Sequence, residues 1–257
     1  MAGEIVICPS HRGACTPEAD AFLRWLGQQG VSVLRAHAIS MICRGRSLLL
    51  SRAYLEGYER ILFWDDDLVP ANPEAVLRML RWKPEDFPEH RLAPVVGGVY
   101  AQKGEPRICA DGVGRFRAEG EPTTVTLGKP GYVRCSYVAT GSMVIDRQTL
   151  KAIVESTPRY PIVHECTHEV SGETFWDFFR PSLRALPAGP GEKTRYQYLG
   201  EDYSFCDRAA QAGVAVYLAT EPLLGHVGSF TWFVQDSLQA QGGRLSPLAS
   251  QVNLEDA

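Results

Sequence analysis

Ile61-Leu62-Phe63-Trp64-Asp65-Asp66-Asp67 is the stretch that decides how this chain is expected to fold, because four apolar residues run directly into three carboxylates. A short apolar run closed by polar residues predicts a buried strand followed by a loop. Like charges at this spacing repel one another, so a divalent cation is the expected compensation. In extended backbone Asp65 and Asp67 point the same way and Asp66 points the opposite way. Their oxygen ligands suit Mg²⁺ or Mn²⁺, and an acidic loop before a helix near Pro73 is the alternative.

The residues on the N-terminal side of this stretch alternate between strand and helix patterns. We expect strands at 5–8, 31–36 and 60–64, and helices at 18–29 and 47–57. Such alternation predicts parallel strands joined by crossover helices. Ligands of these sheets bind outside the carboxyl ends of the strands, where both the 9–13 loop and the acidic triplet fall. The expected class is therefore α/β, with a Rossmann-like mixed sheet that is mainly parallel and flanked by helices.

The remainder of the chain gives weaker patterns. Helices are expected at 73–82 and 201–213, and strands at 92–100, 132–145 and 214–218. The segment 104–131 is rich in glycine, proline and threonine, which predicts short antiparallel strands. Residues 156–198 contain five prolines and are expected to form an irregular insertion, of the kind that serves as a lid or binds an acceptor. Residues 238–257 are expected to form a polar C-terminal tail.

Composition and charge narrow the classes of partner. Of 257 residues, 45% are hydrophobic and 22% are charged, and the net charge is −4, which argues against nucleic-acid binding. No apolar window is long enough for a transmembrane helix, and no basic leader precedes an apolar run, so neither a membrane span nor a signal peptide is expected. The seven cysteines form no C-x-x-C pair, which favours reduced thiols and a cytoplasmic location.

Four further stretches accompany the acidic triplet. They are 44–53, 138–145, 198–206 and 224–228, which contain Arg46, Thr140-Gly141, Glu201-Asp202 and His226. Together with the strand that ends in D-x-D, they resemble the GT-A-fold glycosyltransferases. The resemblance covers roughly 3–103, 132–150 and 196–233. It implies a single GT-A-like catalytic domain over 1–237, with a nucleotide-binding part at 1–103 and an acceptor-binding part at 104–237.

The resemblance also implies roles for individual residues. Asp65, Asp67 and His226 would hold a divalent metal, with Mn²⁺ favoured over Mg²⁺ by the mixed oxygen and nitrogen ligands. Asp202 would be the general base of an inverting hexosyl transfer, and Glu201 would hold hydroxyls; the alternative is a pair that only stabilises the start of a helix. The residues expected around the nucleotide are Ser10, Arg12, Arg46, Asp65, Asp66, Tyr100 and Gly141.

The expected donor is a UDP-sugar, and sugars, lipids, proteins and small molecules all stay open as acceptors. A competing motif is His164-Glu165-Cys166-Thr167-His168, which spells the H-E-x-x-H signature of zinc peptidases. That chemistry needs both histidines on one face of a helix, and Pro158 and Pro161 just before the motif disfavour a helix there. A non-catalytic protein that binds a sugar nucleotide on the same fold is a third possibility.

Overall fold

The structure is a computed structural model, and it describes residues 3–10, 13–37, 39, 41–101, 110–111, 124–163, 170–186, 189, 193–228, 231–233 and 251–254. Its helices are α1 (Pro17–Gln28), α2 (Ile42–Glu56), α3 (Pro73–Leu80), α4 (Arg147–Val154) and α5 (Glu201–Gln211), with a short 3₁₀ helix at Pro84–Asp86. Its strands are β1 (Glu4–Pro9), β2 (Ser32–Ala36), β3 (Arg60–Trp64), β4 (Leu68–Pro70), β5 (Val95–Tyr100), β6 (Ala110–Asp111), β7 (Thr124–Leu127), β8 (Tyr132–Cys135), β9 (Tyr137–Val138), β10 (Ser142–Asp146), β11 (Arg159–Val163), β12 (Val170–Trp176), β13 (Ser182–Leu186), β14 (Arg195–Leu199), β15 (Val216–Val227), β16 (Thr231–Phe233) and β17 (Gln251–Leu254). The strands and helices expected before the acidic triplet are confirmed, but α2 begins at Ile42 and not at residue 47 as expected.

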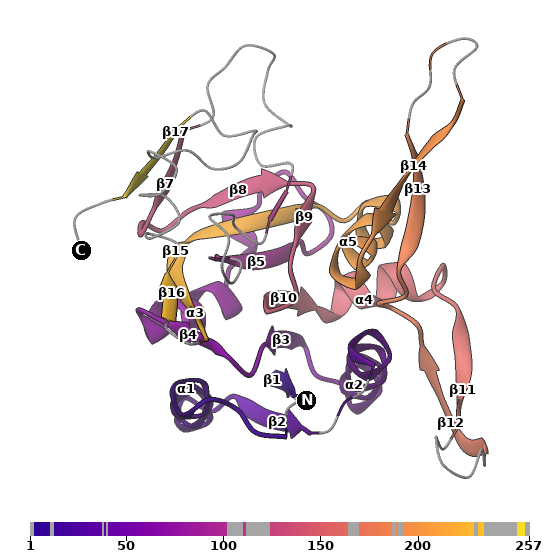
Figure 1. Cartoon of the computed structure of the whole chain (residues 1–257), viewed down its shortest axis with the longest axis horizontal. Coiled ribbons are helices and arrows are strands. Elements are labelled where there is room, and N and C mark those ends of the chain that lie inside the picture. Colours follow the sequence, from indigo (N-terminus) through magenta and orange to yellow (C-terminus); the bar gives the residue numbers. More distant parts are fainter. Residues whose placement is uncertain are drawn as a thin grey trace.

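One mixed sheet forms the centre of the molecule (Figure 1). Its strands lie in the order β16-β15-β5-β10-β3-β1-β2, and β4 and β8 also pair with β15. β1 is parallel to β2 and β3, and β5 is parallel to β15. β10 runs antiparallel between β3 and β5. Five strands therefore share one direction and bring their carboxyl ends to one edge, which confirms the predicted α/β class.

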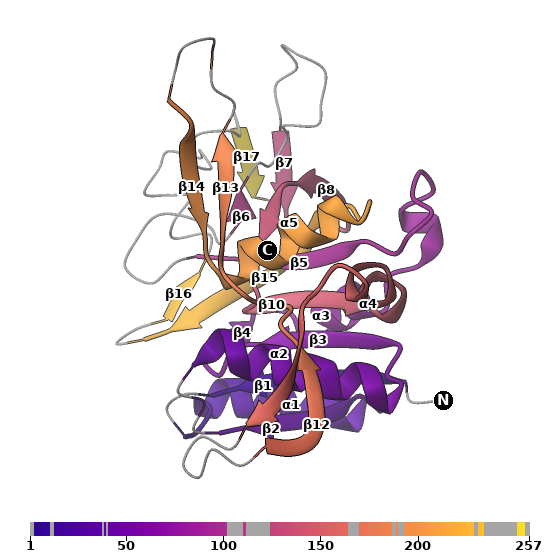
Figure 2. The same cartoon turned by 90° about the vertical axis from the view of Figure 1, so that its right-hand side faces the viewer.

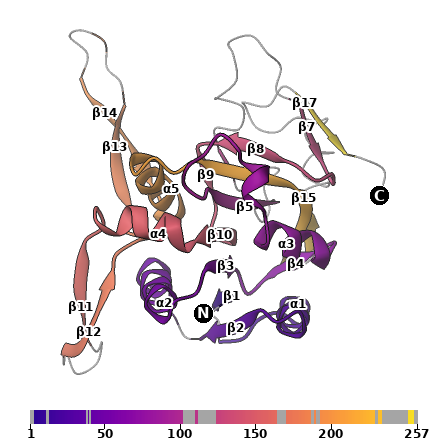
Figure 3. The same ribbon diagram turned by 180° about the vertical axis from the view of Figure 1, so that it is seen from behind.

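Helices cover both faces of this sheet (Figures 1 and 3). α1 and α3 pack on one face, where Leu23 of α1 shares a core cluster with Leu62 of β3. α2, α4 and α5 pack on the other face, where Leu50 of α2 shares a second cluster with Phe63 of β3. Successive side chains of β3 thus alternate between two cores, so the strand is buried on both faces.

Capping residues fix where three of the helices begin or end. The side chain of Thr16 accepts a hydrogen bond from the backbone of α1, and Asn72 does the same for α3. Pro17 and Pro73 follow them at the first helical positions, where a missing N–H costs nothing. Gly57 ends α2 in the left-handed conformation with a φ of 89°. β3 follows α2 in the chain and leads to the acidic triplet.

Residues 156–198 are not the irregular insertion that their prolines predicted. β11 pairs with β12 and β13 pairs with β14, so two antiparallel hairpins project from one side of the body (Figures 1 and 2). Pro158 and Pro181 lie just before β11 and β13, and Pro161 lies where the pairing of β11 with β12 shifts register. These are strand positions that tolerate proline, because no ladder hydrogen bond is lost there.

Two other elements differ from expectation. β15 extends over Val216–Val227 rather than ending near residue 218, because it pairs with β4, β5, β8 and β16 along its length. Within the predicted polar tail, Gln251–Leu254 forms β17, parallel to β7. None of the described helices combines the length and the apolar composition that crossing a membrane requires.

Candidate active site

A cavity of about 380 Å³ lies at the carboxyl edge of the sheet, where β1 and β3 end. Asp65, Asp66 and Asp67 line it from the turn after β3, Glu201 lines it from the start of α5, and His226 lines it from β15. The other lining residues are Pro9, Ile39, Ile42 and Arg46. Four carboxylates and one guanidinium share this space, so the cavity is strongly acidic.

Arg46 joins two of the carboxylates. Its Nη2 donates to Asp65 Oδ1 at 2.7 Å, and its Nη1 donates to Glu201 Oε1 at 3.1 Å. The residue is only 5% exposed, and burial disfavours the charged guanidinium; the two carboxylates outweigh this, so the pKa of Arg46 is raised above its ordinary value. Arg46, which was expected to contact the nucleotide, is therefore paired with two carboxylates, and it links the end of β3 to the start of α5.

His226 lies beside the last carboxylate of the triplet. Its Nε2 is 3.1 Å from Asp67 Oδ1, and its Nδ1 is 3.0 Å from the carbonyl oxygen of Ala101. The backbone fixes this pair, because β4 runs antiparallel to β15 and the Val227 N–H donates to the Asp67 carbonyl at 2.7 Å. The acidic triplet and the late histidine, 159 positions apart, are thus brought together.

The triplet is not extended, and the alternation expected for it is wrong. Asp66 and Asp67 form a turn between β3 and β4, so all three carboxylates line one cavity. The turn is tight because β4 immediately pairs with β15. Ser10 Oγ donates to Asp66 Oδ2 at 2.5 Å, and Ser10 is fully buried. The hydrogen bond from Ser10 therefore helps to fix the position of Asp66 in the turn.

Tyr100 and Gly141 lie behind Asp65. The Gly141 N–H donates to the Tyr100 hydroxyl at 3.0 Å, and the Gly141 carbonyl accepts from the Asp65 N–H at 2.9 Å. A Cβ at position 141 would lie 2.3 Å from the Tyr100 hydroxyl oxygen and 2.9 Å from Asp65 Oδ2. Only glycine fits this space, so these two predicted nucleotide residues shape the wall that positions the acidic turn.

Glu201 and Asp202 stand at the start of α5 in different surroundings. Glu201 lines the cavity and is paired with Arg46. Asp202 is partly buried and is not among the residues that line the cavity, and its carboxylate accepts the Tyr203 N–H at 2.8 Å. Burial, followed by the neighbouring charge of Glu201, raises the pKa of Asp202 to about 6. Such a value is suited to a group that takes up a proton near neutral pH.

Two side chains of this cavity are placed to act as ligands of a divalent cation. Within the described residues, no three His, Cys, Asp or Glu side chains already form a closed ligand cluster. Asp65 is turned toward Arg46, which leaves Asp67 and His226 as the adjacent pair. The Ala101 carbonyl only accepts, so the Nδ1 of His226 donates to it; the Asp67 carboxylate also only accepts, so the Nε2–Oδ1 contact is a hydrogen bond that a cation bound between the two groups would replace, using the lone pair of Nε2. Two lone-pair donors about 3 Å apart fit two neighbouring ligands of one divalent cation, since octahedral ligands lie about 2.1 Å from it.

Other expected residues fall outside this set. Arg12 and the H-E-x-x-H residues 164–168 lie outside the described part of the chain. Ile39 and Ile42, which line the cavity at the start of α2, were not singled out from the sequence. Their signal is weak, because isolated isoleucines before a helix are typical of ordinary packing. Only their position next to Arg46 in the folded chain assigns them to the site.

Comparisons with known proteins agree with the fold. No family model matches the chain, and no curated protein matches it. Among solved structures, the protein A197 from STIV is similar over 89% of this chain and 86% of its own, with a TM-score of 0.52 and 14% identity. A glycosyltransferase involved in the glycosylation of the major capsid of PBCV-1 matches 58% of this chain and 62% of its own, with a TM-score of 0.31 and 11% identity, and no argument rests on that match. The chain therefore shares an α/β fold with A197 over most of both chains, which agrees with the predicted fold class.

Proposed function

We propose that this chain is a metal-dependent glycosyltransferase, which moves a sugar from a nucleoside-diphosphate donor to an acceptor hydroxyl. One observation carries the proposal: a single acidic cavity at the carboxyl edge of the sheet gathers the aspartate triplet, Glu201 and His226 from three distant segments. Ligands of α/β sheets bind at this edge. A folded chain has no structural need for four carboxylates in one cavity, whereas a metal site and an acid–base site both need them.

The charge of the cavity explains the expected metal. When His226 is counted as neutral, four carboxylates and one guanidinium line the cavity, which gives a net charge of −3. A diphosphate alone would be repelled by this charge. Asp67 and His226 would hold the cation, and Asp65 would join them on release from Arg46. When bound, the cation neutralises the diphosphate and the charge that develops on the leaving group. Mn²⁺ is favoured over Mg²⁺ by the imidazole ligand.

The nucleotide would lie between the end of β1 and the start of α2. α2 has no side-chain cap at Met41, and Ile39 and Ile42 line the cavity beside its start, so the N–H groups of its first turn would be available to a ligand there. Backbone N–H groups at a helix N-terminus favour phosphate oxygens. Ser10 and Asp66 fix the shape of the neighbouring turn. A UDP-sugar is the donor that we propose.

Asp202 is the general base in this proposal. Its pKa of about 6 leaves it ionised at neutral pH yet still basic enough to accept a proton from a hydroxyl. Glu201 is ion-paired to Arg46 and would hold a donor or acceptor hydroxyl instead. Direct attack by the activated hydroxyl on the anomeric carbon would invert its configuration. A product with retained configuration would refute this part of the proposal.

A thermal-shift panel tests the donor site. UDP, GDP, CDP and dTDP are each added with Mn²⁺, Mg²⁺ or EDTA. A ligand at about 100 times its Kd stabilises the native state by about 2.7 kcal/mol, and about 5–10 °C of shift is then expected for a chain of this size. We expect UDP to raise the Tm only when the metal is present. Asp67→Asn should abolish this shift. Asp207→Asn, which changes a carboxylate that does not line the cavity, should keep it.

The same panel separates the alternatives. No metal-dependent shift with any nucleotide would refute the proposal. A shift with Zn²⁺ alone, without any nucleotide effect, would favour the peptidase motif at residues 164–168. Metal-dependent UDP binding without hydrolysis or transfer would favour a non-catalytic binding protein.

A further inference from the structure

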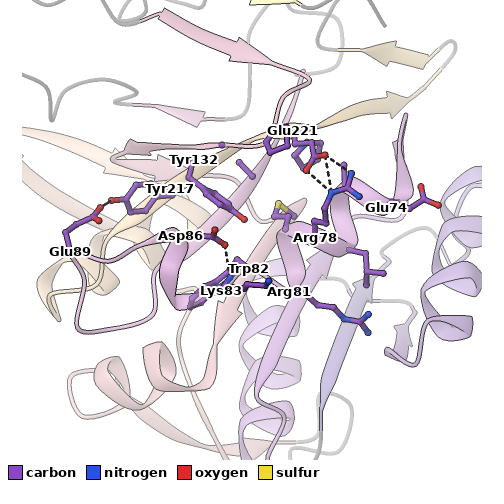
Figure 4. A pocket seen from close by; sticks show the side chains of 17 residues that line it. Glu74, Arg78, Arg81, Trp82, Lys83, Asp86, Glu89, Tyr132, Tyr217 and Glu221 are labelled. Carbon is purple, nitrogen blue, oxygen red and sulfur yellow. Dashed lines mark hydrogen bonds and ion pairs between the residues drawn. The ribbon is translucent and has the colours of Figure 1, made fainter.

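A second, larger cavity of about 840 Å³ lies between α3, β8 and β15 (Figure 4). It contains Trp82, Tyr132 and Tyr217, together with charged side chains of both signs. None of the described residues lines both this cavity and the acidic one. Nothing in the transfer chemistry proposed above uses it, so its side chains need an explanation of their own.

The aromatic rings form one connected wall. Phe87 packs behind it, with its ring centroid 4.6 Å from that of Tyr132, 4.8 Å from that of Tyr217 and 5.3 Å from that of Trp82. This backing holds the three lining rings in place, so the wall is preformed. Rigid aromatic surface with a few placed polar groups is typical of small-ligand sites.

Two polar groups of this wall have no partner. Trp82 is 5% exposed, and its Nε1 is buried without a hydrogen-bond acceptor in the described part of the chain. The Tyr132 hydroxyl has no hydrogen bond to any described residue, and Figure 4 shows it pointing into the cavity near Asp86. Burial, and then the charges of Asp86 and Glu221, raise the pKa of Tyr132 to about 12, so the hydroxyl stays a donor. Unsatisfied buried donors are costly, which makes an acceptor-bearing ligand the natural complement.

The charged residues are close to balance. Arg78 donates to Glu221 with Nη2–Oε1 at 2.6 Å (Figure 4). Arg81 donates to Glu4 at 2.9 Å, so both guanidinium groups are paired with a carboxylate. Glu89 accepts the Tyr217 hydroxyl at 2.6 Å. A strongly charged ligand would find no net opposite charge here. A neutral ligand that both donates and accepts hydrogen bonds, and that has an apolar face for the rings, fits better.

Such a ligand is a sugar, and we propose that this cavity is a second carbohydrate-binding site. It holds a neutral oligosaccharide through the wall of Trp82, Tyr132 and Tyr217, with hydroxyls bonded to Tyr132, Asp86 and Glu221. Binding at this site does not depend on the proposed transfer activity.

The site is separate from the acidic cavity. Glu221 and His226 both lie on β15, five residues apart, which at ~3.3 Å per residue is at most roughly 17 Å, and less because the pairing of β15 shifts register between Leu218 and Leu223. An oligosaccharide bound here therefore presents a part that does not react. If the chain is a glycosyltransferase, this site recognises a remote portion of the acceptor.

Saturation-transfer NMR tests the site on the whole chain, in EDTA and without nucleotide. The probes are neutral trisaccharides of glucose, galactose, mannose and N-acetylglucosamine. We expect at least one to bind. Tyr132→Phe removes only the hydroxyl and should weaken that binding about three- to tenfold, as the loss of one hydrogen bond does. Tyr160→Phe, at a tyrosine that is 41% exposed on β11, should leave it unchanged.

A donor-site variant keeps the two proposals apart. Asp67→Asn should bind the trisaccharide as the wild type does, and UDP with Mn²⁺ should not compete. The proposal is overturned if no trisaccharide binds, if Tyr132→Phe binds at wild-type strength, or if UDP with Mn²⁺ displaces the sugar. Should Tyr132→Phe fail to fold, Glu221→Gln takes its place, with the same loss expected.

Discussion

Among the described residues that line the acidic cavity, Arg46 is the one cationic side chain, and replacing it with methionine removes that charge but keeps an apolar side chain in its place. Two ion pairs are lost, at 2.7 Å to Asp65 and at 3.1 Å to Glu201. At an effective dielectric constant of ~20, each pair gains about 4 kcal/mol of Coulomb energy, and the burial of the guanidinium offsets part of that gain. Breaking a buried pair typically costs about 3–5 kcal/mol.

The exposure of the partners sets where in this range the loss falls. The Arg46 side chain is 6% exposed, but those of Asp65 and Glu201 are 26% and 28% exposed, so water screens the stranded carboxylates. We expect Arg46→Met to lower the free energy of unfolding by about 3 kcal/mol. At about 2–4 °C per kcal/mol, the Tm would fall by roughly 6–12 °C.

The assay is urea unfolding, with Arg52→Met as the matched control. Arg52 also lies on α2 and pairs with Glu56, but it is 70% exposed, so its loss should cost only about 0.3–0.5 kcal/mol. A loss equal to that of Arg52→Met would refute this reasoning.

The remaining predictions concern Gly141, behind the acidic turn, and the proposed base Asp202. Gly141→Ala should cost about 1–3 kcal/mol and weaken metal-dependent nucleotide binding, because its Cβ would lie 2.7 Å from Tyr100 Cζ; Gly172→Ala, with nothing within 4 Å, is the control in the same unfolding and binding assays. The transfer rate should fall as the pH drops below about 6, where Asp202 becomes protonated, and a flat kcat profile down to pH 5 would contradict the role of this base. Asp202→Asn should lose turnover but keep the metal-dependent thermal shift, and transfer at the wild-type rate would exclude Asp202 as the base. Because its folded pKa lies above the unfolded value, ionised Asp202 destabilises the fold above pH 6, so Asp202→Asn should raise the Tm at pH 7 and lose that gain near pH 4.

The sequence predicted the first seventy residues well because their signals are local. Apolar runs of strand length, the cap at Thr16, and Gly57 after α2 each act within a few residues. The end of β3 at Asp65 was also predictable, since an apolar run stops there. Such signals place the acidic triplet at the carboxyl edge of the sheet without any knowledge of tertiary contacts.

The rest of the fold depends on pairing between distant segments, which the sequence alone could not predict. The turn at Asp66-Asp67 depends on β4 pairing with β15, and the length of β15 depends on four neighbouring strands. The hairpins at 156–198 were missed because proline was given the weight of a strand breaker, although Pro158 and Pro181 only precede strands. The ion pairs of Arg46 join β3 to α5 through α2, and no local pattern could indicate them.

Glu201 and Asp202 are neighbours in the chain, yet the fold separates their chemistry. Arg46 is ion-paired with Glu201 directly. Asp202 is partly buried, which raises its pKa, and the charge of Glu201 next to it raises that pKa further. Environments that push the behaviour of two carboxylates apart are how one site obtains both a fixed anion and a proton acceptor. The charge of Arg46 itself lowers the pKa of Asp202, whereas the anion that it holds at Glu201 raises that pKa by a larger amount. Loss of Glu201 should accordingly lower the pKa of Asp202, and Glu201→Gln should move the acid limb of the transfer-rate profile to lower pH, whereas a base at Glu201 itself would abolish the rate at every pH.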